Sequence, residues 1–299
     1  MNVSMRPKVS ICIPTYKQPE FFRRLLQSIV EQDYKDFEVI VTDDTQDQAV
    51  EWVVSEFYSQ LPSLRYYKNP TPLGSPENWN EAVRRAMGEY IKIMHHDDWF
   101  ALPTSLRMFV QMLDENPAVS LAFSASGVYK ENKLARVHIP SRLQLALVRR
   151  NYRYLFGRNC IGAPSAIIYR KALPVIFDTR YKWVVDVQFY VQCLRLNSHF
   201  AHTALPLVNT TSGAPHQVTA QSLGNKEVEL YEWTSFFNEI YKGSGFLFAL
   251  YASLFFVRLF KKHRVQQVDD VPHDLLSTTT NKFILRIIKL TNFASNIGL

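Results

Sequence analysis

Four apolar runs in the first 117 residues are each followed by a segment with helical spacing, and this alternation constrains the fold more than any other feature. The runs are residues 9–14, 37–44, 64–69 and 89–94, and the helical segments are residues 19–32, 50–57, 77–87 and 103–117. Repeated strand–helix units with short connections predict a doubly wound, mainly parallel α/β sheet flanked by helices. Gly88 follows the third helical segment, and we expect it to be the C-cap of that helix.

The composition is typical of a globular protein with a sizeable core, because 47% of the residues are apolar and 20% are charged. The three cysteines, Cys12, Cys160 and Cys193, show neither a disulfide framework nor the spacing of zinc ligands, which favours a reducing compartment. The first residues contain no apolar segment followed by a small-residue cleavage site. We therefore expect a cytoplasmic protein.

The net charge of +7 is concentrated near the C-terminal end, where eight Lys/Arg and three Asp follow residue 240. No nucleic-acid-binding motif accompanies this charge, so nucleic acid is not an expected partner. Residues 243–257 are uncharged but shorter than the roughly 20 residues that span a bilayer. In residues 282–290 the basic side chains share one helical face. These segments predict helices lying in the plane of the inner face of the cytoplasmic membrane; packing against the rest of the protein or in a homodimer is the alternative.

Polar residues follow each apolar run of the predicted sheet, at 14–16, 43–44, 68–74 and 95–98. Sheets of this kind bind ligands beyond the carboxyl ends of their strands. The chain has no glycine motif of a dinucleotide site or P-loop, so a bound phosphate would need a divalent ion, and Mg²⁺ or Mn²⁺ takes one or two carboxylates. Asp97 and Asp98 suit that role, with a solvated turn as the alternative. His95 and His96 are adjacent and point to opposite faces, so at least one of them is structural.

Asp186 is the one acid in the apolar stretch 183–194. Burial disfavours its charge and raises its pKa, which suits a general base. An N-cap or an ion pair with Arg180 or Lys182 is the alternative.

Two blocks, VSICIPTYKQPEFFRRLLQSIVEQDYKDFEVIVTDD (9–44) and GEYIKIMHHDD (88–98), resemble the inverting family 2 glycosyltransferases, which have the GT-A fold. The resemblance is strong over residues 8–117 and continues more loosely to about residue 220. It departs from the family at two positions: His96 stands where an Asp often lies, and Asn78 where an Arg often reaches the nucleotide base.

The resemblance implies a role for each of several residues. Asp186 would deprotonate the acceptor hydroxyl. Asp98 would bind the metal, with Asp97 near the ribose, and His216 in the loop 214–221 would contact the metal or the pyrophosphate. The residues implied in nucleotide binding are Pro14, Thr15, Tyr16, Asp44, Asn78 and Asp97, and those implied in the acceptor or donor-sugar pocket are Asn159, Gly162, Pro164 and Ser165.

We therefore expect a metal-dependent inverting glycosyltransferase that uses Mn²⁺ or Mg²⁺. Its expected substrates are a UDP-sugar and a lipid-linked saccharide, in the synthesis of a bacterial cell-surface polysaccharide. The expected organisation is a GT-A domain over 1–224, with a nucleotide-binding half (1–117) and an acceptor half (118–224), and a helical, basic appendage over 225–299. The alternatives are a sugar nucleotidyltransferase and a non-catalytic, membrane-peripheral scaffold with the same fold.

Overall fold

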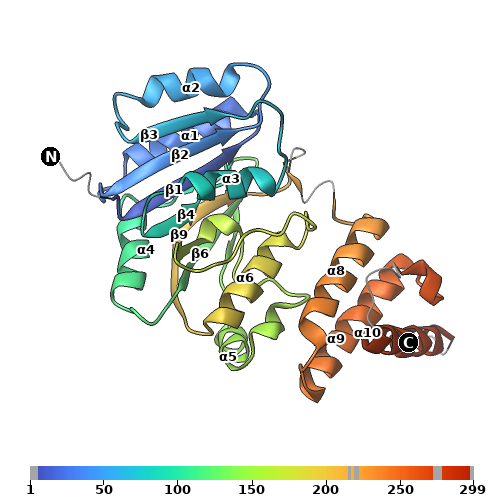
Figure 1. Ribbon diagram of the computed structural model, residues 1–299. Helices are drawn as coiled ribbons and strands as arrows, with labels where there is room; N and C mark the ends of the chain where they lie inside the picture. Colours follow the sequence, from blue (N-terminus) through green and yellow to red (C-terminus); the bar gives the residue numbers. More distant parts are fainter. Residues whose placement is uncertain (1–5, 215–216, 219–221, 272–277, 297–299) are drawn as a thin grey trace.

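The computed structural model describes residues 6–214, 217–218, 222–271 and 278–296, and it contains one large sheet with helices on both faces (Figure 1). The strands are β1 (Val9–Thr15), β2 (Phe37–Asp43), β3 (Leu64–Lys68), β4 (Tyr90–Ile93), β5 (Trp99–Phe100), β6 (Leu121–Lys130), β7 (Lys133–His138), β8 (Ile167–Arg170) and β9 (Phe200–Thr211). The helices are α1 (Pro19–Val30), α2 (Ala49–Phe57), α3 (Glu77–Arg85), α4 (Ser105–Asp114), α5 (Arg142–Arg150), α6 (Val185–Leu196), α8 (Lys226–Tyr241), α9 (Phe246–His263) and α10 (Thr278–Asn296), with short 3₁₀ turns η1 (Tyr152–Leu155), η2 (Pro164–Ala166) and η3 (Val268–Asp270).

The strand order is β3-β2-β1-β4-β8-β6-β9-β5, with β7 paired to β6. The four strands β1 to β4 are parallel to one another, as the alternation of strand and helix predicts. Beyond β4 the sheet becomes mixed, because β8 runs antiparallel to both β4 and β6 while β6 and β9 are parallel. The predicted α/β architecture with C-terminal helices is confirmed, and the run of four parallel strands lies in the first half of the chain.

The sheet separates two hydrophobic cores, since successive side chains of a strand point to opposite faces. In β1, Ile11 and Ile13 belong to the core under α1, α2 and α4. Cys12, between them, belongs to the core that contains α3 and α6. Burial on both faces explains why these strands are continuous apolar runs in the sequence.

Gly88 has a different role from the one expected. Helix α3 ends at Arg85 with Ala86 as its C-cap, so the expectation that Gly88 caps this helix is wrong. A Cβ at residue 88 would lie 2.6 Å from the backbone nitrogen of Ser10, and the Gly88 N–H donates to Ser10 Oγ at 2.8 Å. A glycine is therefore needed here for the close approach of the chain to β1.

The chain crosses the sheet immediately after residues 95–98, which form the acidic turn. β4 ends at Ile93, and Trp99 already pairs with Asn209 of β9 on the other side of β8 and β6. The turn at residues 95–98 therefore extends along the edge of the sheet at which β4 ends and β8 begins, which places Asp97 and Asp98 over the middle of the sheet.

The C-terminal helices share a hydrophobic core with the sheet and α6. Phe156, just after η1, lies with its ring 5.0–6.0 Å from rings of α8 and α9, among them Trp233, Phe248 and Phe256. In α10, Phe283 packs 4.8 Å from Phe237 of α8. Many aromatic side chains of the tail thus pack on protein, whereas Phe246 at the start of α9 is 80% exposed. None of the helices in the described ranges combines the length and the hydropathy needed to cross a membrane.

Candidate active site

A cleft of about 1050 Å³ lies beyond the carboxyl ends of β1, β2 and β4 and extends to the start of α6. Most of the residues singled out in the sequence line it, namely Pro14, Thr15, Tyr16, Asp44, Asn78, Asp97, Asp98, Asn159, Gly162, Pro164 and Asp186. Ser165 does not line it; its side chain is buried behind the acidic turn, where its hydroxyl accepts a hydrogen bond from the His95 N–H. His216 lies outside the described residues.

Two of the residues implied in nucleotide binding are engaged in holding the cleft in shape. The Asp44 carboxylate accepts hydrogen bonds from Asn69 Nδ2 and from the backbone N–H groups of Leu73 and Gly74, at 2.8–2.9 Å. Asn78 Nδ2 lies 3.2 Å from the carbonyl oxygens of both Thr15 and Thr42. Asp44 retains acceptor capacity for a ligand, because a carboxylate offers about four lone-pair sites. Both amide protons of Asn78 are directed to backbone, so we expect Asn78 to position the strand ends.

The carboxylates of the acidic turn are buried, and they accept hydrogen bonds from β9 and from the loop that follows it. Asp98 accepts a hydrogen bond from the Thr211 N–H at 3.2 Å, and Asp97 accepts one from Gln217 Nε2 at 2.8 Å. Burial, and next the charge of Asp97, raise the pKa of Asp98 well above its ordinary value. A divalent ion bound at this turn would favour the ionised form.

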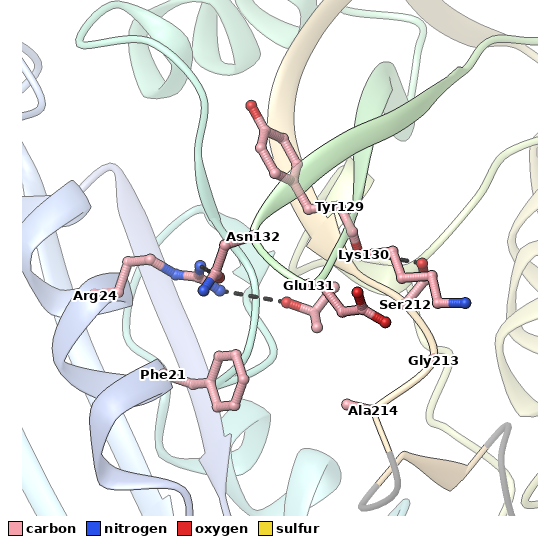
Figure 2. Close-up of a pocket in the computed structure, with 10 residues that line it drawn as sticks. Phe21, Arg24, Tyr129, Lys130, Glu131, Asn132, Ser212, Gly213 and Ala214 are labelled. Carbon is pink, nitrogen blue, oxygen red and sulfur yellow. Dashed lines mark hydrogen bonds between the residues drawn. The ribbon is translucent and has the colours of Figure 1, made fainter.

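Two basic side chains lie behind the turn, outside the lining of the cleft. Lys92 is fully buried in β4, where burial lowers the pKa of its amine well below the ordinary value, and its Nζ donates to the Ser165 carbonyl oxygen. Arg24 stacks on Trp99 with its guanidinium 3.5 Å from the ring centroid, and it donates to the Asp97 carbonyl oxygen at 3.2 Å. Arg24 also lines a second, smaller pocket of about 340 Å³, where it donates to Asn132 (Figure 2). The Arg24 guanidinium offsets part of the charge that two adjacent carboxylates concentrate here.

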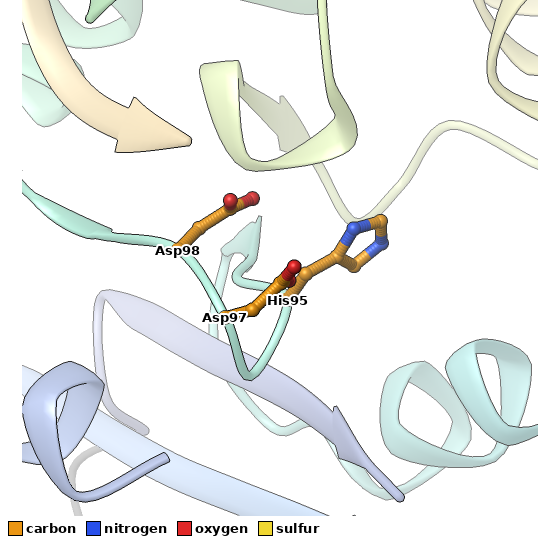
Figure 3. A group of neighbouring side chains, drawn as sticks. All are labelled: His95, Asp97 and Asp98. Atoms are coloured by element: carbon orange, nitrogen blue, oxygen red, sulfur yellow. The ribbon is translucent and has the colours of Figure 1, made fainter. Parts of the chain in front are cut away.

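Three side chains at the turn could hold a metal ion. One ring nitrogen of His95 and one carboxylate oxygen each of Asp97 and Asp98 all lie within 4.8 Å of one another (Figure 3). Burial lowers the pKa of His95 to about 4, so its ring is neutral at pH 7. Carboxylates and a neutral imidazole are metal ligands, and the residues present therefore fit a divalent ion.

Asp186 lies in the first turn of α6 at the other end of the cleft. Its carboxylate accepts hydrogen bonds from Asn159 Nδ2 at 2.8 Å and from the Val187 N–H at 2.7 Å. Burial is the largest influence on this group and raises its pKa to about 7, and the charge of Glu232 adds to the increase. The alternative of an ion pair with Arg180 is not realised, because Arg180 pairs with Asp178 and Glu239.

Several residues of the site carried no signal in the sequence. Thr211 and Gln217 reach the acidic turn from more than 110 residues away. Glu232 of α8 accepts hydrogen bonds from the backbone N–H groups of residues 182–184, directly before α6. No local pattern could indicate these contacts, since each joins elements that are distant in the chain.

The family model for glycosyl transferase family 2 matches residues 10–174. This range covers more than half of the chain and includes β1 to β4, the acidic turn and the segment with Asn159. The protein therefore belongs to glycosyl transferase family 2, and the resemblance noted in the sequence is confirmed.

Curated relatives align with part of the chain. An uncharacterized glycosyltransferase of Methanocaldococcus jannaschii is 28% identical over 193 residues, covering 63% of this chain and 65% of the relative. A protein of Campylobacter jejuni named GalNAc(5)-diNAcBac-PP-undecaprenol β-1,3-glucosyltransferase is 26% identical over 144 residues, covering 44% of this chain and 46% of the relative. The aligned region thus spans less than two thirds of either relative.

Solved structures match nearly the whole chain. TarS residues 1–349 of S. aureus, in complex with UDP, superposes with a TM-score of 0.67 at 17% identity, covering 98% of this chain and 92% of that one. A mannosyltransferase from Pyrobaculum calidifontis, in complex with GDP-Man and Mn²⁺, has a TM-score of 0.57 at 16% identity, covering 97% and 87%. These matches establish the GT-A type of fold, with its C-terminal helices, for this chain.

Proposed function

We propose that this protein is a metal-dependent inverting glycosyltransferase that moves a sugar from a nucleoside-diphosphate sugar to a hydroxyl group of a saccharide acceptor. The observation that carries the proposal is the cleft itself, in which a carboxylate with a pKa of about 7 faces the same space as the His95, Asp97 and Asp98 group. A general base and a metal-binding end, where a bound ion would hold the diphosphate, are what an in-line displacement of a diphosphate requires.

Asp186 takes the proton of the acceptor hydroxyl in this mechanism. The acceptor oxygen then forms the new bond to the anomeric carbon, while the bond from that carbon to the diphosphate breaks and the diphosphate leaves with the electron pair. Asn159 and the Val187 N–H hold the Asp186 carboxylate in place, and its remaining lone pairs serve the acceptor. The raised pKa suits a base that works near neutral pH.

Asp98 and Asp97 would hold the divalent ion, which we take to be Mn²⁺ or Mg²⁺, with His216 as a further contact. When bound, the ion stabilises the negative charge of the leaving diphosphate. Tyr16, which is 49% exposed at the end of β1, and Asp44 would contact the nucleotide base.

We take a UDP-sugar as the donor. The neighbour with the TM-score of 0.67 is in complex with UDP, and another structure of the same protein is in complex with UDP-GlcNAc. The GDP-Man complex of the mannosyltransferase makes a guanosine donor the alternative to be tested.

The proposed acceptor is a lipid-linked saccharide presented at a membrane surface. The name of the Campylobacter relative describes an acceptor on undecaprenol diphosphate. The cleft of this chain includes Arg136 and Lys182, whose positive charges would complement a diphosphate. Helix α9 also exposes Leu247, Leu250 and Leu254, which suits peripheral contact with lipid.

The test is a thermal-shift screen of the full chain against UDP-, GDP- and other nucleotide sugars, each with and without Mn²⁺. A ligand present at 100 times its dissociation constant should stabilise the fold by about 2.7 kcal/mol. We expect a metal-dependent shift with one class of donor, and loss of that metal-dependent shift in Asp98→Ala while its circular dichroism stays that of the parent. If Asp98→Ala keeps its Mn²⁺-dependent affinity, the metal assignment is wrong. Metal-dependent hydrolysis of a nucleotide sugar separates the enzyme from a non-catalytic scaffold with the same fold.

A further inference from the structure

His95 stands beside the acidic turn as a nitrogen donor among oxygen donors. One ring nitrogen of His95 lies within 4.8 Å of one carboxylate oxygen each of Asp97 and Asp98 (Figure 3). All three side chains come from one turn of four residues, so their relative positions are fixed by a short piece of backbone.

The ring and the backbone of His95 are each held by one contact. Trp79 of α3 packs against it with ring centroids 4.5 Å apart and an angle of 48° between the planes. The backbone N–H of His95 donates to Ser165 Oγ at 2.9 Å. A ligand that is already fixed loses little conformational freedom when a metal binds.

One ring nitrogen of His95 is buried without a partner. Nε2 is inaccessible to solvent and makes no hydrogen bond within the part of the chain that the structure describes. Buried polar atoms of this kind usually have a partner, and a bound metal ion would supply one.

We propose that His95 supplies a nitrogen ligand to the divalent ion and that this ligand makes the site select transition-metal ions such as Mn²⁺ and Co²⁺ over Mg²⁺. Imidazole favours transition metals, whereas Mg²⁺ prefers a shell of oxygen ligands. This inference rests on the proposed metal-dependent function. A site made only of carboxylates would lack this selectivity for transition-metal ions over Mg²⁺.

The direct readout is spectroscopic. Mn²⁺ is added to the full chain, alone and together with UDP, and the bound ion is examined by electron spin-echo envelope modulation, which detects a directly coordinated nitrogen. We expect nitrogen modulation in the parent protein and none in His95→Asp. Competition of Mg²⁺ against bound Mn²⁺, followed by the electron paramagnetic resonance signal of free Mn²⁺, measures selectivity without any transfer reaction.

The variants separate selectivity from simple loss of the site. His95→Asp replaces the nitrogen with oxygens, so the ratio of Mn²⁺ to Mg²⁺ affinity should fall by at least about tenfold, the lower end of the effect of losing a supporting group at a metal site. His96→Asn is the matched control, since His96 precedes the same carboxylates but is outside the three-residue group; it should keep both the modulation and the ratio. Thermal unfolding of each variant verifies that it is folded.

The outcomes distinguish this inference from the function on which it rests. If Mn²⁺ binds without nitrogen modulation, or if His96→Asn abolishes the modulation and His95→Asp does not, His95 is not the ligand, although metal-dependent donor binding stands. If Mn²⁺ binds neither alone nor with UDP, the metal-dependent function and the role of His95 are both wrong.

Discussion

At the scale of one residue, the burial of the Asp186 carboxylate lowers the stability of the folded state at neutral pH. Its carboxylate is placed in an apolar setting that raises its pKa to about 7, about three units above the ordinary value near 4. The folded state therefore binds this proton more tightly than the unfolded state does. The fold loses stability as the pH rises from about 4 to about 7, by up to a few kcal/mol, and the loss persists above that range.

Replacing Asp186 with Asn should abolish the base while leaving the donor site intact. We expect turnover to fall by about 10²–10⁴, because proton removal matters chiefly in the transition state, while binding of donor and metal is nearly unchanged. Steady-state kinetics and a donor titration measure the two effects. Asp178→Asn is the matched control, an acid eight positions earlier that pairs with Arg180. Loss of donor binding in Asp186→Asn would make Asp186 a structural or donor-sugar contact, and undiminished transfer would remove it from the mechanism.

The raised pKa also predicts the pH dependence of the reaction. Asp186 must be ionised to accept a proton, so kcat/KM should increase with pH up to about 7 and then level off. The measurement is made with saturating metal ion, so that titration of the acidic turn does not add to the profile. The melting temperature of Asp186→Asn, relative to the parent protein, should increase between pH 5 and pH 8. A kcat/KM that is flat from pH 5 to pH 8 would contradict the assignment of the base.

At the scale of elements, the position of α6 depends on α8. Glu232 of α8 accepts hydrogen bonds from the N–H groups of Lys182, Trp183 and Val184 at 2.8–2.9 Å. These groups directly precede α6, which begins at Val185. An anionic side chain at this end also interacts favourably with the helix dipole. The helix that carries Asp186 is therefore positioned by the C-terminal helices.

Glu232→Gln should weaken this contact and lower the pKa of Asp186. A buried N–H left without an acceptor costs about 1–3 kcal/mol, so the urea midpoint should decrease. The charge of Glu232 raises the pKa of Asp186, so its removal should move the rise of kcat/KM to lower pH. Glu227→Gln, an exposed position on the same helix, should leave both quantities unchanged. An unchanged pH profile in a destabilised Glu232→Gln protein would restrict Glu232 to a purely structural role.

At the scale of the whole molecule, α9 has two different faces. Phe248, Phe256 and Phe260 are buried against the rest of the protein. The opposite face exposes Leu247, Leu250 and Leu254. The exposed basic residues 258 and 261 follow at helical spacing and therefore extend the same face. Figure 1 shows α9 and α10 at the end of the molecule away from β1 to β3. Exposed leucines that continue into basic side chains suit an anionic lipid surface.

Changing the three exposed leucines of α9 to Gln should reduce binding to anionic liposomes at low salt by at least about tenfold, because each buried leucine contributes about 1.5–3 kcal/mol. Cosedimentation with vesicles containing phosphatidylglycerol measures the effect. Leu134→Gln with Leu143→Gln is the control, since both leucines are exposed outside α9. A parent protein that ignores these vesicles but sediments as a dimer that the α9 variant loses would assign this face to a second copy of the chain.

The sequence by itself determined the elements and the chemistry available at their ends. Strands β1 to β4 and helices α1 to α4 follow from local apolar periodicity, and the acidic turn and Asp186 were visible because charge is unusual next to or within an apolar run. Tertiary structure decided what those groups contact. The crossing of β5 to β9, the support of Asp97 by Gln217 and the contact of Glu232 with the start of α6 join residues about 50 to 120 positions apart. Gly88 was misread for the same reason, since what requires a glycine there is the nearby backbone of β1. Periodicity records which side of an element is buried, whereas the partner that buries it is set by packing across the whole chain.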